Sequence, residues 1–333
     1  ISIFDSKKYN AIKTIKDKYI EGNGYSIDPF GITTIKYSKF STPELSVIVP
    51  IYNNGKFLLY KCFNSLLRSS IFDKMEILLI DDGSTDEETI NTISDIKNKY
   101  TNVRTYSFTD GGSGTASRPR NKGIELATAK YVTYLDPDNE AINDGYAKLF
   151  EIVNKNDYDF AFGGIMKLSD REATFNYFSS DKEINNPKAE LIKKDFKTNS
   201  IQACVIKKEL ITKNNIENPI GAAGQDSLFF QELMINAKKA YYINIPIHIY
   251  YAARNDSVVN TISHKFFEKF LIMERYQVQK LKEYNLLNEY INRRYEHFMN
   301  NWYLVKLALI EDEKERKLSL EIIDEIKKLY NKL

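Results

Sequence analysis

Short apolar runs alternate with amphipathic stretches in the part of the chain that begins at Leu45. Parallel strands buried on both faces are near-continuous apolar runs, and an apolar spacing of three or four residues is typical of helices. The pattern predicts strands over Leu45–Pro50, Met75–Ile80, Val103–Phe108 and Tyr131–Leu135, with helices over Phe57–Arg68, Asp86–Lys99 and Arg120–Thr128. Strands and helices that alternate over short loops indicate an α/β fold, with a mostly parallel sheet flanked by helices.

The alternation loosens after Asp138. The pattern there predicts strands over Tyr158–Met166, Ile201–Ile206 and Ala240–Ile245, and helices over Asp144–Asn154 and Asp226–Asn236. From Lys265 onward apolar residues recur at helical spacing, which predicts an all-α C-terminal extension. The polar lead-in is broken by Gly and Pro, so it is interpreted as a linker or packing arm. We therefore expect three parts, 1–43, 44–262 and 263–333. The first residue is Ile1 rather than Met, which suggests a piece of a longer protein.

Composition narrows the class of protein. The chain has 333 residues and a net charge of +2, which argues against a dedicated nucleic-acid binder. It contains neither an apolar run of about 18 residues nor a signal peptide. Cys62 and Cys204 lie among apolar residues and are expected to be buried free thiols, which fits a cytoplasmic protein. The apolar stripes of the helical extension are interpreted as packing surfaces; peripheral association with the inner face of the membrane and homo-oligomerisation stay open.

Carboxylates follow two of the predicted strands directly. The strand Tyr131–Leu135 ends at Asp136-Pro137-Asp138, and the strand Met75–Ile80 ends at Asp81-Asp82. Open α/β sheets bind their ligands at the carboxyl ends of the strands. Two hard oxygen ligands suit a divalent cation shared with phosphate oxygens, and a carboxylate also accepts hydrogen bonds from a ribose or a uracil ring N–H. These residues predict a nucleoside diphosphate site, although Asp82 is equally compatible with a solvated turn.

Other candidate ligand contacts flank these carboxylates. Pro50 and Tyr52 end the first strand and would line the same crevice, where Tyr52 would pack on a base or belong to a surface turn. Arg118 and Arg120 lie at a predicted helix start, where they would contact a diphosphate or a base, or remain a solvated cap. Arg254 follows a predicted strand and would approach phosphate, or belong to an ordinary loop.

Asp226 lies where a Gly- and Ala-rich loop enters a predicted helix. One interpretation is a helix N-cap, and the other is a general base near a donor sugar. Two other signals are weaker. The glycine run 111–117 resembles a dinucleotide motif, but it follows the third strand and lacks the expected acidic residue. His264 would complete a metal site or have a structural role.

Several of these segments occur in a fixed order that closely resembles glycosyltransferase family 2, which has the GT-A fold. The resemblance extends from about Leu45 to Asn260 and is closest to bacterial enzymes that decorate teichoic acids, capsules and other surface glycans. The segments that carry it are Val47–Asn53, Ile80–Asp86, Arg118–Gly123, Leu135–Asp138 and Gln225-Asp226.

The resemblance implies a role for each matching residue. Asp82 would bind the uracil or its ribose, and Asp136 would contact the ribose and, through a metal, the diphosphate. Asp138 would be the direct ligand of Mn²⁺ or Mg²⁺, and Asp226 would be the catalytic base. Gln225 replaces the Glu of the family's usual Glu-Asp pair, which puts an acceptor contact in doubt. The Gln-X-X-Arg-Trp motif of processive synthases is absent, which favours the addition of one sugar per encounter.

The resemblance thus implies an inverting, metal-dependent transferase. It would move a hexose or N-acetylhexosamine from a UDP-sugar donor to a hydroxyl of a glycan, glycolipid or glycoprotein acceptor by single displacement. Two alternatives remain. Sugar nucleotidyltransferases usually carry a basic Gly-rich loop after the first strand, but Pro50–Gly55 contains no Arg or Lys. A catalytically impaired nucleotide- or glycan-binding module is compatible with Gln225.

Overall fold

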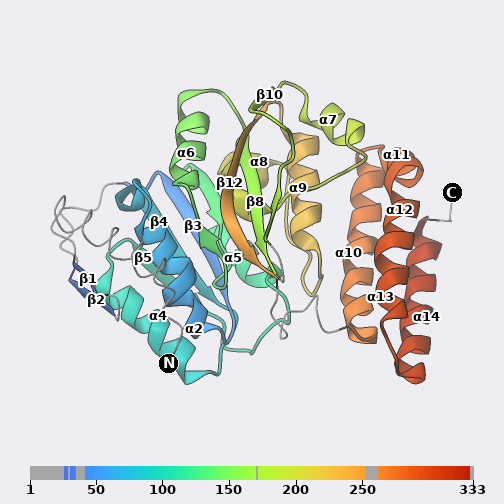
Figure 1. The fold of residues 1–333 in the computed structure, drawn as a ribbon, viewed down its shortest axis with the longest axis horizontal. Coiled ribbons are helices and arrows are strands. Elements are labelled where there is room, and N and C mark those ends of the chain that lie inside the picture. Colours follow the sequence, from blue (N-terminus) through green and yellow to red (C-terminus); the bar gives the residue numbers. More distant parts are fainter. Residues whose placement is uncertain (1–25, 29–30, 35–41, 170–171, 253–261, 331–333) are drawn as a thin grey trace.

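The protein is built around one large sheet with a helical bundle at one end (Figure 1). The computed structural model describes residues 26–28, 31–34, 42–169, 172–252 and 262–330. The sheet has ten strands, in the order β10-β12-β8-β11-β6-β3-β4-β5, with β7 paired to β12 and β9 to β8. Its strands are β3 (Leu45–Ile51), β4 (Met75–Asp81), β5 (Val103–Ser107), β6 (Tyr131–Tyr134), β7 (Glu140–Ala141), β8 (Phe160–Leu168), β9 (Glu172–Phe175), β10 (Lys182–Ile184), β11 (Cys204–Lys207) and β12 (Ala240–Tyr251). A separate sheet pairs β1 (Ser26–Asp28) with β2 (Gly31–Thr34).

Helices cover the sheet and form the C-terminal bundle. Those between the strands are α2 (Gly55–Phe57), η1 (Leu58–Phe63), α3 (Asn64–Leu67), η2 (Phe72–Lys74), α4 (Glu87–Lys99), α5 (Ser117–Leu126), α6 (Gly145–Lys155), α7 (Pro187–Lys193), η3 (Ile201–Ala203), α8 (Lys208–Lys213) and α9 (Gln225–Asn236). The bundle contains α10 (His264–Glu283), α11 (Leu287–Tyr290), η4 (Ile291–Tyr295), α12 (Glu296–Phe298), η5 (Met299–Tyr303), α13 (Leu304–Ala308) and α14 (Glu313–Tyr330).

The strands β6, β3, β4 and β5 are parallel, as the apolar runs predict. Every residue of β3, β4 and β6 is buried, because helices cover both faces of this half of the sheet. The sheet as a whole is mixed, since β11 runs antiparallel to both β6 and β8. The sequence pattern does not reveal this reversal, because a short buried strand has the same apolar composition in either direction.

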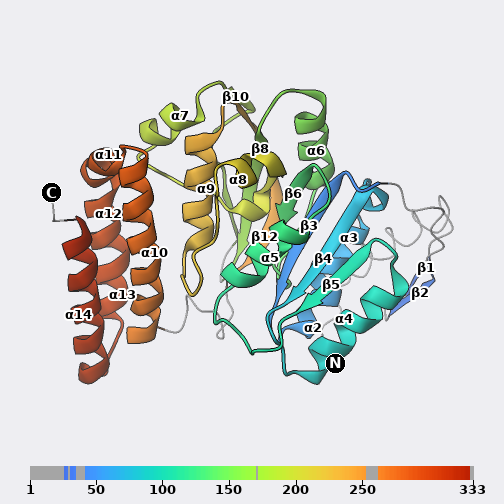
Figure 2. The same ribbon diagram turned by 180° about the vertical axis from the view of Figure 1, so that it is seen from behind.

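Two hydrophobic clusters pack on opposite sides of the sheet. Along β3, Ile48 belongs to one cluster, whereas Val47 and Val49 belong to the other. The cluster that contains Ile48 continues through α9 into the C-terminal helices. Figure 2 shows the bundle beside α9, at the end of the molecule opposite α4 and β5. The predicted helical extension is therefore confirmed, and its core is continuous with that of the sheet.

The structure also bears on the cysteines and on membrane-spanning segments. Cys62 and Cys204 are both buried and free, as predicted. Within the described ranges, no helix has both the length and the apolar character required to cross a bilayer.

Gly123 provides a test of how α5 packs on the sheet. A Cβ atom added at Gly123 would lie 2.3 Å from Cγ2 of Ile48, which is fully buried on β3. We expect Gly123→Ala to lower the free energy of unfolding by about 1–3 kcal/mol, because the crowded core must shift. Chemical denaturation measures this change. Without the close contact, Ala would stabilise the helix by about 0.5–1 kcal/mol, so a more stable variant would contradict the packing.

Candidate functional site

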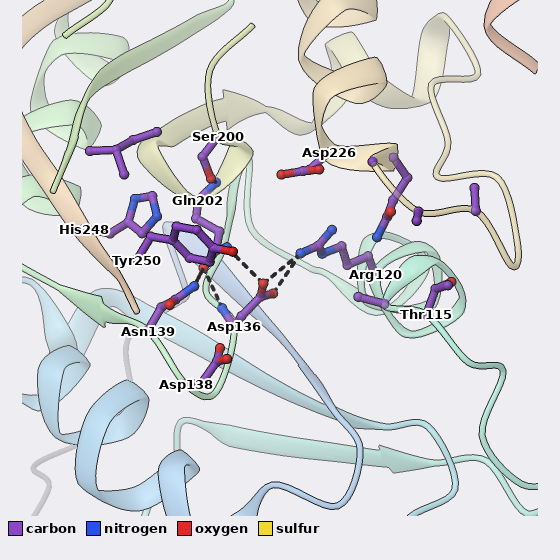
Figure 3. Close-up of a pocket in the computed structure, with 16 residues that line it drawn as sticks. Thr115, Arg120, Asp136, Asp138, Asn139, Ser200, Gln202, Asp226, His248 and Tyr250 are labelled. Carbon is purple, nitrogen blue, oxygen red and sulfur yellow. Dashed lines mark hydrogen bonds and ion pairs between the residues drawn. The ribbon is translucent and has the colours of Figure 1, made fainter. Parts of the chain in front are cut away.

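A cavity of about 310 Å³ lies at the carboxyl end of β6. Its walls come from the loop after β6, the start of α5, η3, the start of α9 and the second half of β12 (Figure 3). This volume is at the small end of the range for ligand pockets. Four charged residues that were predicted to belong to the site line it together: Arg120, Asp136, Asp138 and Asp226.

Arg120 and Asp136 form an ion pair in the wall of the cavity. Nη2 of Arg120 donates to both carboxylate oxygens of Asp136, at 2.8 and 3.0 Å. Burial disfavours the charge of Arg120, but the carboxylates of Asp136 and Asp226 outweigh this effect and raise its pKa. Nε and Nη1 of Arg120 are buried and have no hydrogen-bond partner among the residues that the structure describes. Arg120 is therefore a fixed positive charge between two carboxylates that belong to different elements.

Asp138 lies two residues beyond Asp136, in the same loop after β6. Figure 3 shows its carboxylate next to Asp136, on the opposite side from Asp226. The part of the chain that the structure describes contains no cluster of three or more His, Cys, Asp or Glu residues able to hold a metal ion by themselves. Mg²⁺ commonly uses only one or two protein carboxylates and completes its coordination with substrate phosphates and water. The donor set at Asp138 fits a cation bound in that way.

Asp226 faces Arg120 from the first turn of α9 (Figure 3). The N-cap of α9 is Gly224, with φ +76°, and no side chain caps this helix. The interpretation of Asp226 as the N-cap is therefore wrong. The preceding loop is held by α10, because Ala223 N–H donates to Lys269 O at 3.2 Å. A Cβ atom at Gly224 would lie 3.0 Å from the Phe270 ring, so glycine suits both the backbone conformation and the packing.

A second group of candidates lies beside the cavity rather than in its wall. Asp82 is only 2% exposed, and its Oδ1 accepts from Nε of Arg118 at 2.7 Å. Its Oδ2 accepts from N–H and Oγ of Ser113, both at 2.7 Å. The solvated-turn interpretation of Asp82 is therefore wrong. Arg118 also pairs with Asp110, at 2.8 Å.

The glycine-rich loop covers this second group. The Tyr52 ring lies so near Gly112 that an added Cβ atom would be 2.5 Å from it. The loop continues into Thr115 and Ala116, which line the cavity. Its glycines thus allow close packing beside Tyr52 and Asp82. The glycine run is not a dinucleotide motif, but the loop that contains it leads directly to the cavity.

The remaining candidates are less informative. Pro50 and Pro137 are buried and do not line the cavity, so their assignment as donor contacts stays a prediction. Arg254 lies outside the described residues. His264 is hydrogen-bonded through Nδ1 to Glu315 on α14 at 2.7 Å and is not among the residues that line the cavity. Its contact supports the structural interpretation.

Gln202 and His248 line the cavity but were not predicted to belong to the site. Tyr250 also lines it and begins the segment that contains the candidate Arg254. Gln202 lies in η3, where a strand was predicted from Ile201. His248 and Tyr250 lie in the second half of β12, which was predicted to end at Ile245. Proline often ends a strand, but in β12 the pairing with β8 changes register on both sides of Pro246 and then continues to Tyr251. Burial lowers the pKa of His248 to about 4, although Asp136 opposes this, so its ring adds no charge to the cavity at neutral pH.

Comparisons with known proteins identify the family. The family model described as glycosyl transferase family 2 matches residues 46–211. The uncharacterized glycosyltransferase YibD of Escherichia coli is 30% identical over 264 residues, which cover 77% of this chain and 73% of YibD. Poly(ribitol-phosphate) beta-N-acetylglucosaminyltransferase TarP of Staphylococcus aureus is 30% identical over 226 residues, 64% of this chain and 63% of TarP.

Solved structures give the same picture of the fold. The crystal structure of S. aureus TarS 1-349 in complex with UDP-GlcNAc matches with a TM-score of 0.68 at 18% identity, over 86% of this chain and 81% of that chain. This likeness confirms the expected GT-A fold. The family model and the YibD match lead to one assignment: the chain belongs to glycosyltransferase family 2.

Proposed function

We propose that this glycosyltransferase is inverting and metal-dependent, and that it transfers a hexose or N-acetylhexosamine from a UDP-sugar to a hydroxyl of a bacterial surface glycan or glycoconjugate. The observation that carries the proposal is the convergence of Arg120, Asp136, Asp138 and Asp226 on one cavity. The names of TarP and of the UDP-GlcNAc complex of TarS support the donor class and the kind of acceptor.

The charged residues of the cavity are proposed to act on two different substrates, the sugar donor and the acceptor. In this proposal Asp138 holds Mn²⁺ or Mg²⁺, which would supply Lewis-acid neutralisation of the diphosphate. Asp136 orients the nucleotide, and Arg120 balances negative charge that develops on the leaving group. Asp82, Arg118 and Tyr52 are proposed to bind the uridine next to the cavity. Asp82 is buried and paired with Arg118, and the half-exposed Tyr52 ring packs against Gly112 of the loop that leads into the cavity.

Asp226 is proposed as the general base on the acceptor side. It removes the proton from the acceptor hydroxyl while the hydroxyl oxygen attacks the anomeric carbon. The bond from that carbon to the diphosphate breaks on the opposite face, and its electron pair leaves with UDP. One displacement inverts the anomeric configuration. Asp226 and Asp138 line the same cavity and come from different elements, which suits attack and departure on opposite faces.

Release of UDP from a panel of UDP-sugars tests the proposed function. We expect one or a few donors to be consumed with Mn²⁺, by slow hydrolysis without an acceptor and faster with a hydroxyl acceptor, and EDTA to stop the reaction. Pyrophosphate release from a nucleoside triphosphate would favour a nucleotidyltransferase instead. UDP binding without turnover of any donor would favour an impaired binding module, for which Gln225, a lining residue, is the motivating feature.

A further inference from the structure

The side chain of Gln202 is hydrogen-bonded to the loop that carries Asp138. Its Oε1 accepts from the backbone N–H of Asp136 at 2.9 Å and from Nδ2 of Asn139 at 3.0 Å. Its Nε2 donates to Oδ2 of Asp136 at 2.9 Å. One amide therefore contacts both the backbone and the carboxylate of Asp136, as well as the far end of the turn (Figure 3).

The segment held in this way is a tight turn. Asn139 N–H donates to Asp136 O at 3.0 Å, which closes a four-residue turn with Pro137 and Asp138 at its centre. Proline suits the second position of such turns because its φ is already fixed. Because Oε1 of Gln202 accepts from both ends of the turn, it restricts the direction in which Asp138 projects.

Gln202 is itself anchored. It is 5% exposed, and its backbone carbonyl accepts from the hydroxyl of Tyr146 on α6 at 2.9 Å. Oδ1 of Asn139 accepts from Tyr251 N–H on β12 at 3.3 Å. The turn is thus connected through Gln202 and Asn139 to two elements that come later in the chain, which suits a side chain that positions others.

The charge of the residue at position 202 also matters. Asp136 is already paired with Arg120, so a neutral donor adds a hydrogen bond without adding charge. A carboxylate in place of the Gln202 amide would replace the donor that faces Oδ2 of Asp136 with an acceptor, and the two like charges would repel. It would also bury an additional negative charge.

We propose that Gln202 is a positioning residue that fixes the Asp136-Pro137-Asp138 turn in its metal- and donor-binding geometry, and that it must be a neutral amide to do so. This inference rests on the proposed function, because the proposed function is what gives the turn a metal and a donor to bind. Partners one contact removed from a metal ligand typically change metal affinity or activity by about 10- to 100-fold when they are replaced.

Calorimetric titration of Mn²⁺ and UDP into the full chain tests the proposal, together with the KM for the donor and kcat. Gln202→Met removes the amide at similar volume, and Gln202→Glu replaces its donor with an acceptor. We expect both to weaken Mn²⁺-dependent UDP binding by about 10- to 100-fold, with the Glu variant weaker than the Met variant. The matched control is Gln277→Met, which removes a buried amide from α10 that contacts Tyr330; it should bind like wild type.

A purely structural role for Gln202 predicts a different outcome. In that case the Gln202 variants would have a lower melting temperature, but their Kd for UDP with Mn²⁺ and their KM for the donor would stay within twofold of wild type. This result would overturn the proposal. If Gln202→Glu does not fold, Gln202→Met decides alone. Wild-type protein that binds no UDP with Mn²⁺ would overturn the proposed function and this inference with it, whereas normal wild-type binding with unchanged variants would overturn the inference only.

Discussion

The Asp138→Asn variant is expected to lower kcat for sugar transfer by about 10³-fold while the protein remains folded. Asn keeps the size of the side chain but removes the charge that is proposed to hold the divalent cation. Without the cation, the departing diphosphate would lose several kcal/mol of stabilisation in the transition state. Each 1.4 kcal/mol of that loss lowers the rate roughly tenfold. The measurement is the initial rate of UDP release at saturating donor and Mn²⁺, with circular dichroism to verify the fold.

A matched control is Asp157→Asn. The Asp157 side chain is 96% exposed and pairs with Lys207, which lies opposite Tyr131 at the start of β6, whereas the cavity lies at the carboxyl end of that strand. Its rate should equal that of wild type. Asp138→Asn with more than a tenth of the wild-type rate, or wild-type protein equally active in EDTA, would show that the turn after β6 does not bind the cation on which the chemistry depends.

The Asp226→Asn variant is the second large expected effect, and it should separate chemistry from donor binding. Removing the general base should reduce kcat by about 10²- to 10⁴-fold. Mn²⁺-dependent UDP binding should stay near the wild-type value, because Asp226 enters the cavity from α9 rather than from the turn that holds Asp138. Single-turnover transfer and calorimetry provide the two measurements.

Gln225, the residue before Asp226, provides the comparison variants for Asp226→Asn. Gln225 also lines the cavity and is 8% exposed, and it occupies the position of the family's usual Glu. Gln225→Glu should retain transfer, because the proposed base is unchanged. If Asp226→Asn kept transfer and Gln225→Ala lost it, the assignment of the base to Asp226 would be wrong.

The regular part of the fold was predictable because its physical signals are local. The buried parallel strands β3, β4 and β6 are apolar along their whole length, and each is followed by residues with helical spacing. The carboxylates Asp136 and Asp138 could be placed at the ligand-binding edge of the sheet because both follow the buried strand β6 directly, and open α/β sheets bind ligands at the carboxyl ends of their strands.

The missed residues depend on contacts between distant segments. His248 reaches the cavity because β12 continues past Pro246, where it pairs with both β8 and β7. Gln202 was missed because an amide next to an apolar strand has no local signature, and its importance lies in contacts with Asp136, 66 residues earlier. Similarly, the burial of Asp82 depends on Ser113 and Arg118, which follow it by 31 and 36 residues.

Anomalous diffraction at the manganese edge, from crystals grown with UDP and Mn²⁺, tests the central claim most directly. The account predicts one manganese peak within bonding distance of the Asp138 carboxylate and of the UDP phosphates, with the uracil next to Asp82 and Tyr52. Asp226 should lie across the cavity from the metal, with space between them for the sugar. Manganese and UDP bound away from the Asp136-Pro137-Asp138 turn would contradict the account.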